Sequence, residues 1–394
     1  MPKITFIPSL TPLRGIAAIL VVFFHFSIFA SPLLPSDNPL IGKWYLMVDM
    51  FFVLSGFIMY HVYGSWFEDS IKRPAFLKYM QARFARLYPL HLFMFLFMLA
   101  WFFVLNYRFG YEELPGIFQS ILDPKAIPTT LLLVQGWGFH LEATWNTASW
   151  SISVEWFLYL LFPFLILFLV RFKKVGSWML FALAFAGMLF LIYYVHPAYD
   201  LALAESRGFP ANPLAPPSYS FDFISGPALG RGFCGFVIGL LCYELYRKDW
   251  QRKLLSKGFW FPILWIGMMT LWSFDLLPDY IAVLLFGLLI LSSAFAEGRV
   301  KKILNNRLFT FLGDISYSIY MVHIPLLLVN MFIGMLIAGR FQGFGGVENP
   351  VFMDYLKAWG MAFVFLLLVI GVATLTYTYI EKPWRRRLKQ YFQK

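Results

Sequence analysis

The sequence predicts an all-α protein, a polytopic bundle of about ten transmembrane helices with both ends of the chain in the cytoplasm. Three observations lead to this fold class. Hydrophobic residues make up 60% of the 394 residues and charged residues only 13%, which is more apolar surface than a water-soluble domain can bury. The apolar residues fall into runs of about 20, the length that crosses a bilayer as a helix. Lys and Arg also gather in alternate loops between those runs.

The expected spans cover residues 13–31, 45–63, 87–106, 152–170, 177–195, 230–246, 258–274, 280–296, 310–332 and 355–380. We interpret the first as a retained helix, because it lacks the small-residue cleavage site of a signal peptide. The loops that follow even-numbered spans are basic, within residues 72–86, 171–174, 247–257 and 299–307, and so is the tail 382–389. The alternate loops are acidic or poor in charge. The positive-inside rule therefore places both termini in the cytoplasm.

The net charge of +11 is explained by these basic loops, so no nucleic-acid partner is expected. Cys234 and Cys242 lie eight positions apart in an apolar run, a spacing that fits neither a zinc site nor a disulfide framework. We expect them to be packing residues and expect no metal site. We also expect one membrane domain over residues 1–394, without an appended soluble domain.

Two outer loops, 107–151 and 196–229, are long and rich in Pro, Trp, Tyr and Gly. Within the first, residues 127–139 are apolar but too short to span, so we expect them to re-enter the membrane or lie in its interface. The aromatic side chains fit two roles. They form an ordinary interfacial belt, or they form a platform for an extracytoplasmic acceptor.

The first span carries one cation and one imidazole. Arg14 and His25 are eleven residues apart, which is three helical turns plus about 20°, so both side chains lie on one stripe of the helix. Their separation along the axis is roughly 16 Å, about half the hydrocarbon thickness. An ionisable group in a membrane span is by default a functional-site hypothesis, and packing against a neighbouring helix is the alternative.

Three further ionisable residues fall at a similar depth on other spans: Asp49, Glu155 and His323. Because each is costly in lipid without a partner, we expect the four residues to meet in one polar cavity and to be catalytic. The alternative is interhelical hydrogen bonding that fixes helix pairing. We expect Ser151, Tyr320 and Trp150 to contact the substrate; Ser151 shares a helical stripe with Glu155, and Tyr320 shares one with His323.

A different chemistry is predicted at the inner face. Arg14 lies at the start of the first span. Arg83 and Arg86 lie just before the third span, and their spacing of three residues places them on one helical face. Guanidinium groups bind phosphate through paired hydrogen bonds, so a phosphate-bearing cytoplasmic molecule with a long arm would fit. The alternative is anchoring to anionic membrane lipids.

Several segments of the sequence together resemble the bacterial acyltransferase 3 family of integral membrane O-acyltransferases. The matching segments, in order, are LRGIAAILVVFFHF, DMFFVLSGF, RFARLYPLH, TASWSISVEWFLYLLFP, GDISYSIYMVHIPLL and EKPWRR. The resemblance implies ten core helices in a bacterial inner membrane. It also implies acyl-CoA, most often acetyl-CoA, as a cytoplasmic co-substrate and no permanently bound cofactor. The implied acceptor is a saccharide or glycolipid hydroxyl on the outer side.

The family motifs place the arginine and histidine of the first helix on Arg14 and His25, and the acidic residue of the fourth on Glu155. Many relatives carry a second acidic residue directly after that glutamate, where this chain has Trp156. Some relatives also carry a soluble hydrolase-like domain, which we do not expect here.

The resulting mechanistic hypothesis makes His25 the general base that deprotonates the acceptor hydroxyl. Asp49 or Glu155 would fix its tautomer, Arg14 would hold the coenzyme, and a Tyr or Ser hydroxyl would stabilise the oxyanion. A transient acyl-histidine is a second chemistry. Two other functional classes stay open: a proton-coupled transporter or flippase of a lipid-linked saccharide, and a membrane scaffold. The sequence does not indicate an oligomeric state.

Overall fold

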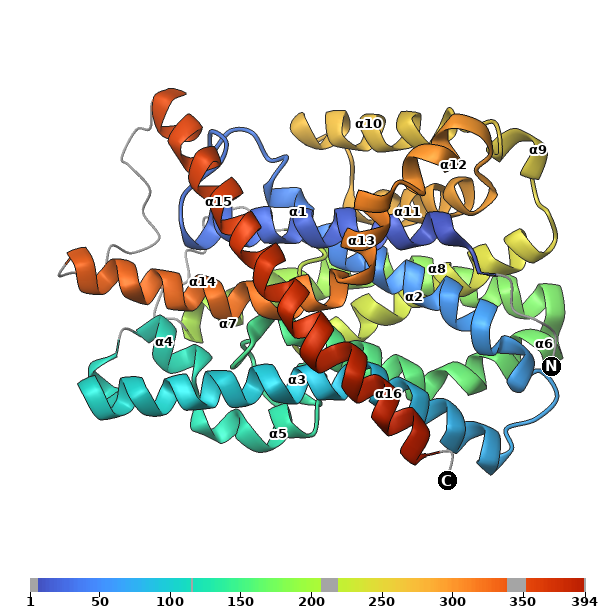
Figure 1. Ribbon diagram of the computed structural model, residues 1–394. Helices are drawn as coiled ribbons and strands as arrows, with labels where there is room; N and C mark the ends of the chain where they lie inside the picture. Colours follow the sequence, from blue (N-terminus) through green and yellow to red (C-terminus); the bar gives the residue numbers. More distant parts are fainter. Residues whose placement is uncertain (1–5, 115, 207–218, 339–351, 393–394) are drawn as a thin grey trace.

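The computed structural model describes residues 6–114, 116–206, 219–338 and 352–392, and in these ranges the only regular elements are helices. The longer helices are α1 (Thr11–Phe29), α2 (Met47–Tyr63), α3 (Arg73–Phe109), α6 (Trp150–Phe190), α8 (Ala228–Arg247), α10 (Trp260–Ser273), α11 (Asp279–Phe295), α14 (Ser316–Ala338) and α15 (Phe352–Thr376). Shorter helices are α4 (Gly116–Ile121), α5 (Ile127–Leu131), α7 (His196–Ser206), α9 (Arg252–Leu255), α12 (Gly298–Leu304), α13 (Arg307–Asp314) and α16 (Lys382–Tyr391). Figure 1 shows most of the long helices running side by side, with α15 and α16 crossing the others obliquely.

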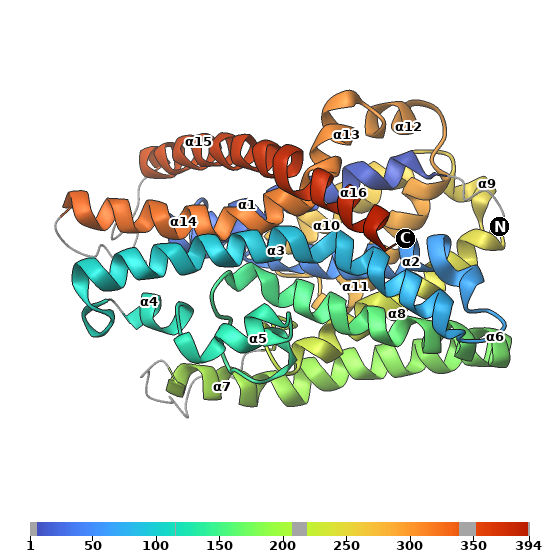
Figure 2. The same cartoon turned by 60° about the horizontal axis from the view of Figure 1, so that its bottom comes forward.

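Among the described residues, seven helical segments are long and apolar enough to cross a membrane, and an eighth is formed if α11 and α12 are taken as one bent span. The chain is thus a multi-pass membrane protein. α10 corresponds to the expected span 258–274 but has only 14 residues. The segment Thr147–Ser206 contains two expected spans in one run of 60 helical residues. It is broken at Lys173, where φ is 48° and ψ is −130°. Figure 2 shows the chain reversing there. The number ten stays a prediction.

Two predicted boundaries differ from the structure. α3 begins at Arg73, well before the expected start at residue 87, because its polar first turns continue the helix beyond the apolar part. The expected span 310–332 is divided at Ile315 into α13 and α14. Residues 127–139 form the short helix α5 and a 3₁₀ turn that pack on α3, α6 and α8. The Tyr88 hydroxyl donates to the Leu131 carbonyl at 3.0 Å, which helps to hold this segment.

Small residues allow the central helices to approach closely. α2 and α8 form the most extensive helix pair. A Cβ atom at Gly239 would overlap the Val53 carbonyl, and one at Gly56 would overlap the Phe236 carbonyl. Where α1 meets α13, a Cβ at Gly15 would lie 2.8 Å from the Gly313 nitrogen. Such contacts are typical of helix packing in membranes, where small residues let backbones touch.

The labelled ends of the chain lie toward the same end of the bundle, together with α9 and the break in α6 (Figure 2). α4 and α7 lie at the opposite end. The end with the termini therefore also carries basic segments such as 247–257, and the positive-inside rule predicts that it faces the cytoplasm.

Candidate functional site

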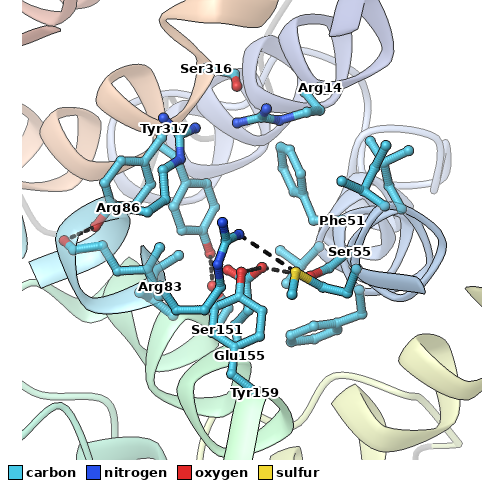
Figure 3. Close-up of a pocket in the computed structure, with 18 residues that line it drawn as sticks. Arg14, Phe51, Ser55, Arg83, Arg86, Ser151, Glu155, Tyr159, Ser316 and Tyr317 are labelled. Atoms are coloured by element: carbon cyan, nitrogen blue, oxygen red, sulfur yellow. Dashed lines mark hydrogen bonds between the residues drawn. The ribbon is translucent and has the colours of Figure 1, made fainter. Parts of the chain in front are cut away.

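A cavity of about 150 Å³ lies between α1, α2, α3, α6 and α14 (Figure 3). Its polar lining comprises Arg14, Ser55, Arg83, Arg86, Ser151, Glu155, Tyr159, Ser316, Tyr317 and Tyr320. Aliphatic and aromatic side chains of α2, among them Phe51 and Ile58, complete the wall. Six of the ten residues named from the sequence as site candidates therefore surround one cavity.

The three candidate arginines have different surroundings. Arg86 forms an ion pair with the buried Glu381 carboxylate, and Ser318 donates to the same carboxylate at 2.9 Å. Arg83 donates to the Tyr63 hydroxyl at 2.6 Å and lies over the rings of Tyr63 and Tyr159. Within the described parts of the chain, Arg14 has neither an ion pair nor a hydrogen bond from its guanidinium. Arg14 is thus the cation on this wall that is most available to a ligand.

Glu155 belongs to this cavity and not to the histidines. Ser55 donates to its Oε1 atom at 2.7 Å, and the Tyr159 hydroxyl donates to the same atom at 2.5 Å. These bonds fix the carboxylate on the arginine side, so the expected contact between Glu155 and His25 is not formed.

The two histidines meet beyond the cavity. His323 Nε2 lies 3.2 Å from His25 Nδ1, and the ring centroids are 4.9 Å apart. His323 Nδ1 lies 2.7 Å from the Tyr320 carbonyl oxygen, and His25 Nδ1 lies 3.0 Å from the Val21 carbonyl oxygen. His323 is fully buried, whereas His25 is half-buried.

These contacts assign the tautomers, because a carbonyl oxygen can only accept a hydrogen bond. Both Nδ1 atoms must carry the proton. His323 Nε2 is then an acceptor for the His25 Nδ1–H group, which it shares with Val21. The remaining ring nitrogen, His25 Nε2, keeps its lone pair, and no described side chain hydrogen-bonds to it.

Tyr320 and Ser151 lie between the arginine-lined cavity and the histidine pair. Their hydroxyl oxygens are 2.7 Å apart, and both side chains line the cavity. The Tyr320 ring is also 5.6 Å from the His323 ring. The two hydroxyls therefore stand where a molecule in the cavity would approach the imidazoles.

Asp49 is the clearest departure from the sequence-based prediction. It is fully buried, and both carboxylate oxygens accept hydrogen bonds from Arg231, the shortest at 2.8 Å. The expected partnership between Asp49 and His25 is therefore not formed. A buried carboxylate needs a fixed cation, and Arg231 on α8 supplies it from the neighbouring helix.

Arg231 also binds the segment that precedes α8. Its Nη1 atom donates to Asp222 at 2.9 Å and to the Phe223 carbonyl at 3.1 Å. The Trp150 ring lies 5.1 Å from the guanidinium carbon, and Trp150 is only 7% exposed. Trp150 thus covers an ion pair, and its expected contact with substrate stays a prediction.

Asp222 is the second carboxylate that Arg231 binds. Its side chain is 39% exposed and is held by Arg231, so it lies at the edge of the buried network. Sequence reasoning did not select Asp222, Arg231 or Glu381. Arg231 could have been found as a cation inside the expected span 230–246, where a charge requires a partner on another helix.

The model of a family described as an acyltransferase domain matches residues 7–379. The chain belongs to the acyltransferase 3 family. Among curated proteins of this kind, "Acyltransferase MdmB" of Streptomyces mycarofaciens is 27% identical over 98% of this chain and 94% of its own length. "Protein 2 in picA locus" of Rhizobium radiobacter is 33% identical over 37% of this chain and 72% of its own length. No solved structure matches.

Membership confirms the resemblance read from the motifs. Because the family match covers nearly the whole chain, the cavity and the histidine pair are both parts of the acyltransferase domain. As a member of the acyltransferase 3 family with several membrane-spanning helices, the protein is a membrane acyltransferase.

Proposed function

We propose that this protein is a bacterial inner-membrane O-acyltransferase that uses cytoplasmic acyl-CoA, most simply acetyl-CoA. The acceptor is a hydroxyl group of an extracytoplasmic or lipid-linked saccharide. The observation that carries the proposal is the unpartnered Nε2 atom of His25, held in a fixed tautomer beyond a cavity lined by arginines. Phosphate groups of the donor would bind the arginines, and the acceptor would reach His25 from the other side.

The reaction follows from the tautomer. His25 Nε2 removes the proton from the acceptor hydroxyl as its oxygen attacks the thioester carbonyl carbon, because a neutral imidazole is a suitable base at physiological pH. The carbon–sulfur bond then breaks, and the imidazolium returns its proton to the departing thiolate. The products are the ester and the free thiol of coenzyme A.

Two other groups assist this step. His323 Nε2 accepts from His25 Nδ1–H and keeps that proton away from the reacting nitrogen, which is the positioning role of the acid in a hydrolase triad. The hydroxyls of Tyr320 and Ser151 lie at the end of the cavity and can donate to the oxygen that becomes negative during the attack. Arg14 would contact a donor phosphate, since no described residue neutralises its charge.

The experiment uses purified protein in nanodiscs with radiolabelled acetyl-CoA and candidate saccharide acceptors. We expect the substitution His25→Ala to reduce acyl transfer by about 10²- to 10⁴-fold, the range of general-base contributions. His61→Gln is the control, because His61 lies elsewhere on α2 near Tyr243. Undiminished turnover in His25→Ala would remove the proposed base.

The same assay separates direct transfer from an acyl-histidine intermediate. Direct transfer predicts no labelled protein when acceptor is omitted. A covalent intermediate predicts label on His25 in rapidly quenched protein, released by hydroxylamine, together with ping-pong kinetics. In cells, mass spectrometry of envelope polysaccharide with and without the intact protein would identify the acceptor.

A further inference from the structure

The C-terminal helix α16 brings additional cations to the arginine wall. Figures 1 and 2 both show α16 beside the first half of α3, and the two helices pack together. We propose that Arg385 and Lys389 on α16 bind the phosphate groups at the nucleotide end of acyl-CoA, together with Arg83 and Arg86. This inference rests on the proposed function and extends its donor site to a sixth helix.

Glu381 fixes the orientation of α16. Its carboxylate is 1% exposed and is bound by Arg86 of α3 and Ser318 of α14. Arg385 follows four residues later and Lys389 eight residues later, so both lie on the helix face that begins with Glu381. That face is directed at α3. Arg385 and Lys389 therefore lie on the side of α16 that packs against the helix carrying Arg83 and Arg86.

The cluster has more positive charge than its surroundings neutralise. Glu381 is already engaged by Arg86, and Glu155 is held by hydroxyl groups. Within the residues that the structure describes, no carboxylate forms an ion pair with Arg83, Arg385 or Lys389. Like charges held together without counterions destabilise a fold. A ligand with several negative charges would remove this repulsion on binding.

The position of the cluster favours the donor over a lipid headgroup. Arg83 and Arg86 line the same cavity as Tyr320 and Ser151, and the Tyr320 ring lies beside His323, the partner of His25. Coenzyme A has a diphosphate and a separate ribose phosphate, which matches a spread of four cations better than one lipid phosphate does. Arg386 and Arg387 are more exposed than Arg385, and Arg387 lies over the Trp384 ring. These two residues are placed to meet lipid.

The test measures binding of coenzyme A and of 3′-dephospho-coenzyme A by calorimetry, with full-length protein in nanodiscs of neutral lipid. Arg385→Gln and Lys389→Gln should each weaken coenzyme A binding about tenfold, as expected for the loss of a charge-assisted contact. One of the two substitutions should weaken the binding of 3′-dephospho-coenzyme A much less than the binding of coenzyme A. That result would assign the substituted residue to the ribose phosphate. The conservative variant Arg385→Lys should retain most of the affinity.

Arg387→Gln is the matched control and should bind as the wild type does. If Arg385→Gln and Lys389→Gln also bind coenzyme A like the wild type, the inference is wrong while the proposed function stands. If the wild-type protein binds no coenzyme A, the proposed function fails as well. The same titrations in nanodiscs that contain anionic lipid test the alternative. If anionic lipid weakens coenzyme A binding by the wild type, and the substitutions remove only that effect, the cluster is a lipid site and the inference is overturned.

Discussion

At the scale of single residues, the assignment of protons in the histidine pair gives His323 a role distinct from that of His25. His323 contacts the Tyr320 carbonyl and His25, so it orients the base and is a positioning residue in the proposed mechanism. Its own position is fixed by complete burial.

We expect His323→Leu to lower kcat about 100-fold, at the lower end of general-base contributions, because the His25 Nδ1–H group loses one of its two acceptors and keeps only the Val21 carbonyl. His323→Gln, whose side-chain oxygen can accept the same hydrogen bond, should recover part of the loss. The KM for acetyl-CoA should change little in both variants. Steady-state kinetics in nanodiscs would test this, and equal losses in Leu and Gln variants would contradict a hydrogen-bonding role.

The Asp49–Arg231 pair leads to a prediction about stability. Asp49→Asn would leave the buried Arg231 with only the partly exposed Asp222 as counterion, so it should destabilise the protein by about 3 kcal/mol, the lower end of the cost of breaking a buried ion pair. Thermal unfolding in detergent would show the effect as a large fall in Tm. Asp275→Asn is the control, since the Asp275 side chain is 69% exposed and 3.7 Å from Lys43, where an ion pair contributes little.

The candidate residues illustrate what the sequence can and cannot predict. Depth along each expected helix predicted that His25, Asp49, Glu155 and His323 meet in one cavity, but only His25 and His323 meet, and Glu155 lines the cavity with the arginines. It could not choose partners, because residues at one depth can face different neighbours. Asp49 was at the expected depth but faces α8, where Arg231 binds it.

At the scale of elements, the contact between α2 and α8 depends on the absence of side chains. The backbone of each helix occupies the space that a Cβ atom on the other would need. This contact positions Asp49 of α2 opposite Arg231 of α8. It therefore helps to fix α2, which forms one wall of the cavity.

Gly239→Ala and Gly56→Ala should each force α2 and α8 apart. Because the obstruction is backbone and cannot rotate away, the cost should reach about 3 kcal/mol, the upper part of the range for overpacking. Gly267→Ala on α10 is the control, since nothing lies within 4 Å of the added atom. Thermal unfolding of the three variants would compare them, and an unchanged Tm in Gly239→Ala would contradict the close approach.

Element boundaries were predicted less well than element positions. Apolar length identified the membrane-spanning part of each helix but not where the helix begins or is interrupted, so the polar start of α3 and the division at Ile315 were missed. The break at Lys173 falls in an expected loop of the sequence, yet almost every residue around it is helical, which hydropathy alone cannot show.

At the scale of the whole molecule, the arrangement of basic segments predicts sidedness. Lys174 is exposed beside the break in α6, and Glu113 is exposed near α4 at the opposite end of the bundle. With both native cysteines replaced by serine, Lys174→Cys should react with an impermeant maleimide only from the cytoplasmic side. Glu113→Cys should react only from outside. Labelling of intact cells and of inverted vesicles would check both, and the reverse pattern would overturn the proposed direction of acyl transfer.

Arg231 also has a consequence for biogenesis. Arg231 lies in the first turn of α8, and an arginine within a membrane segment opposes insertion, by up to about 2.5–3.5 kcal/mol at the centre of the segment on translocon scales. All three guanidinium nitrogens donate hydrogen bonds, and two of them donate to Asp49 on the earlier helix α2. Insertion of α8 is therefore most favourable when α2 is already in the bilayer and Asp49 can pair with Arg231. Because α2 precedes α8 in the chain, it is synthesised first, which favours this order of assembly.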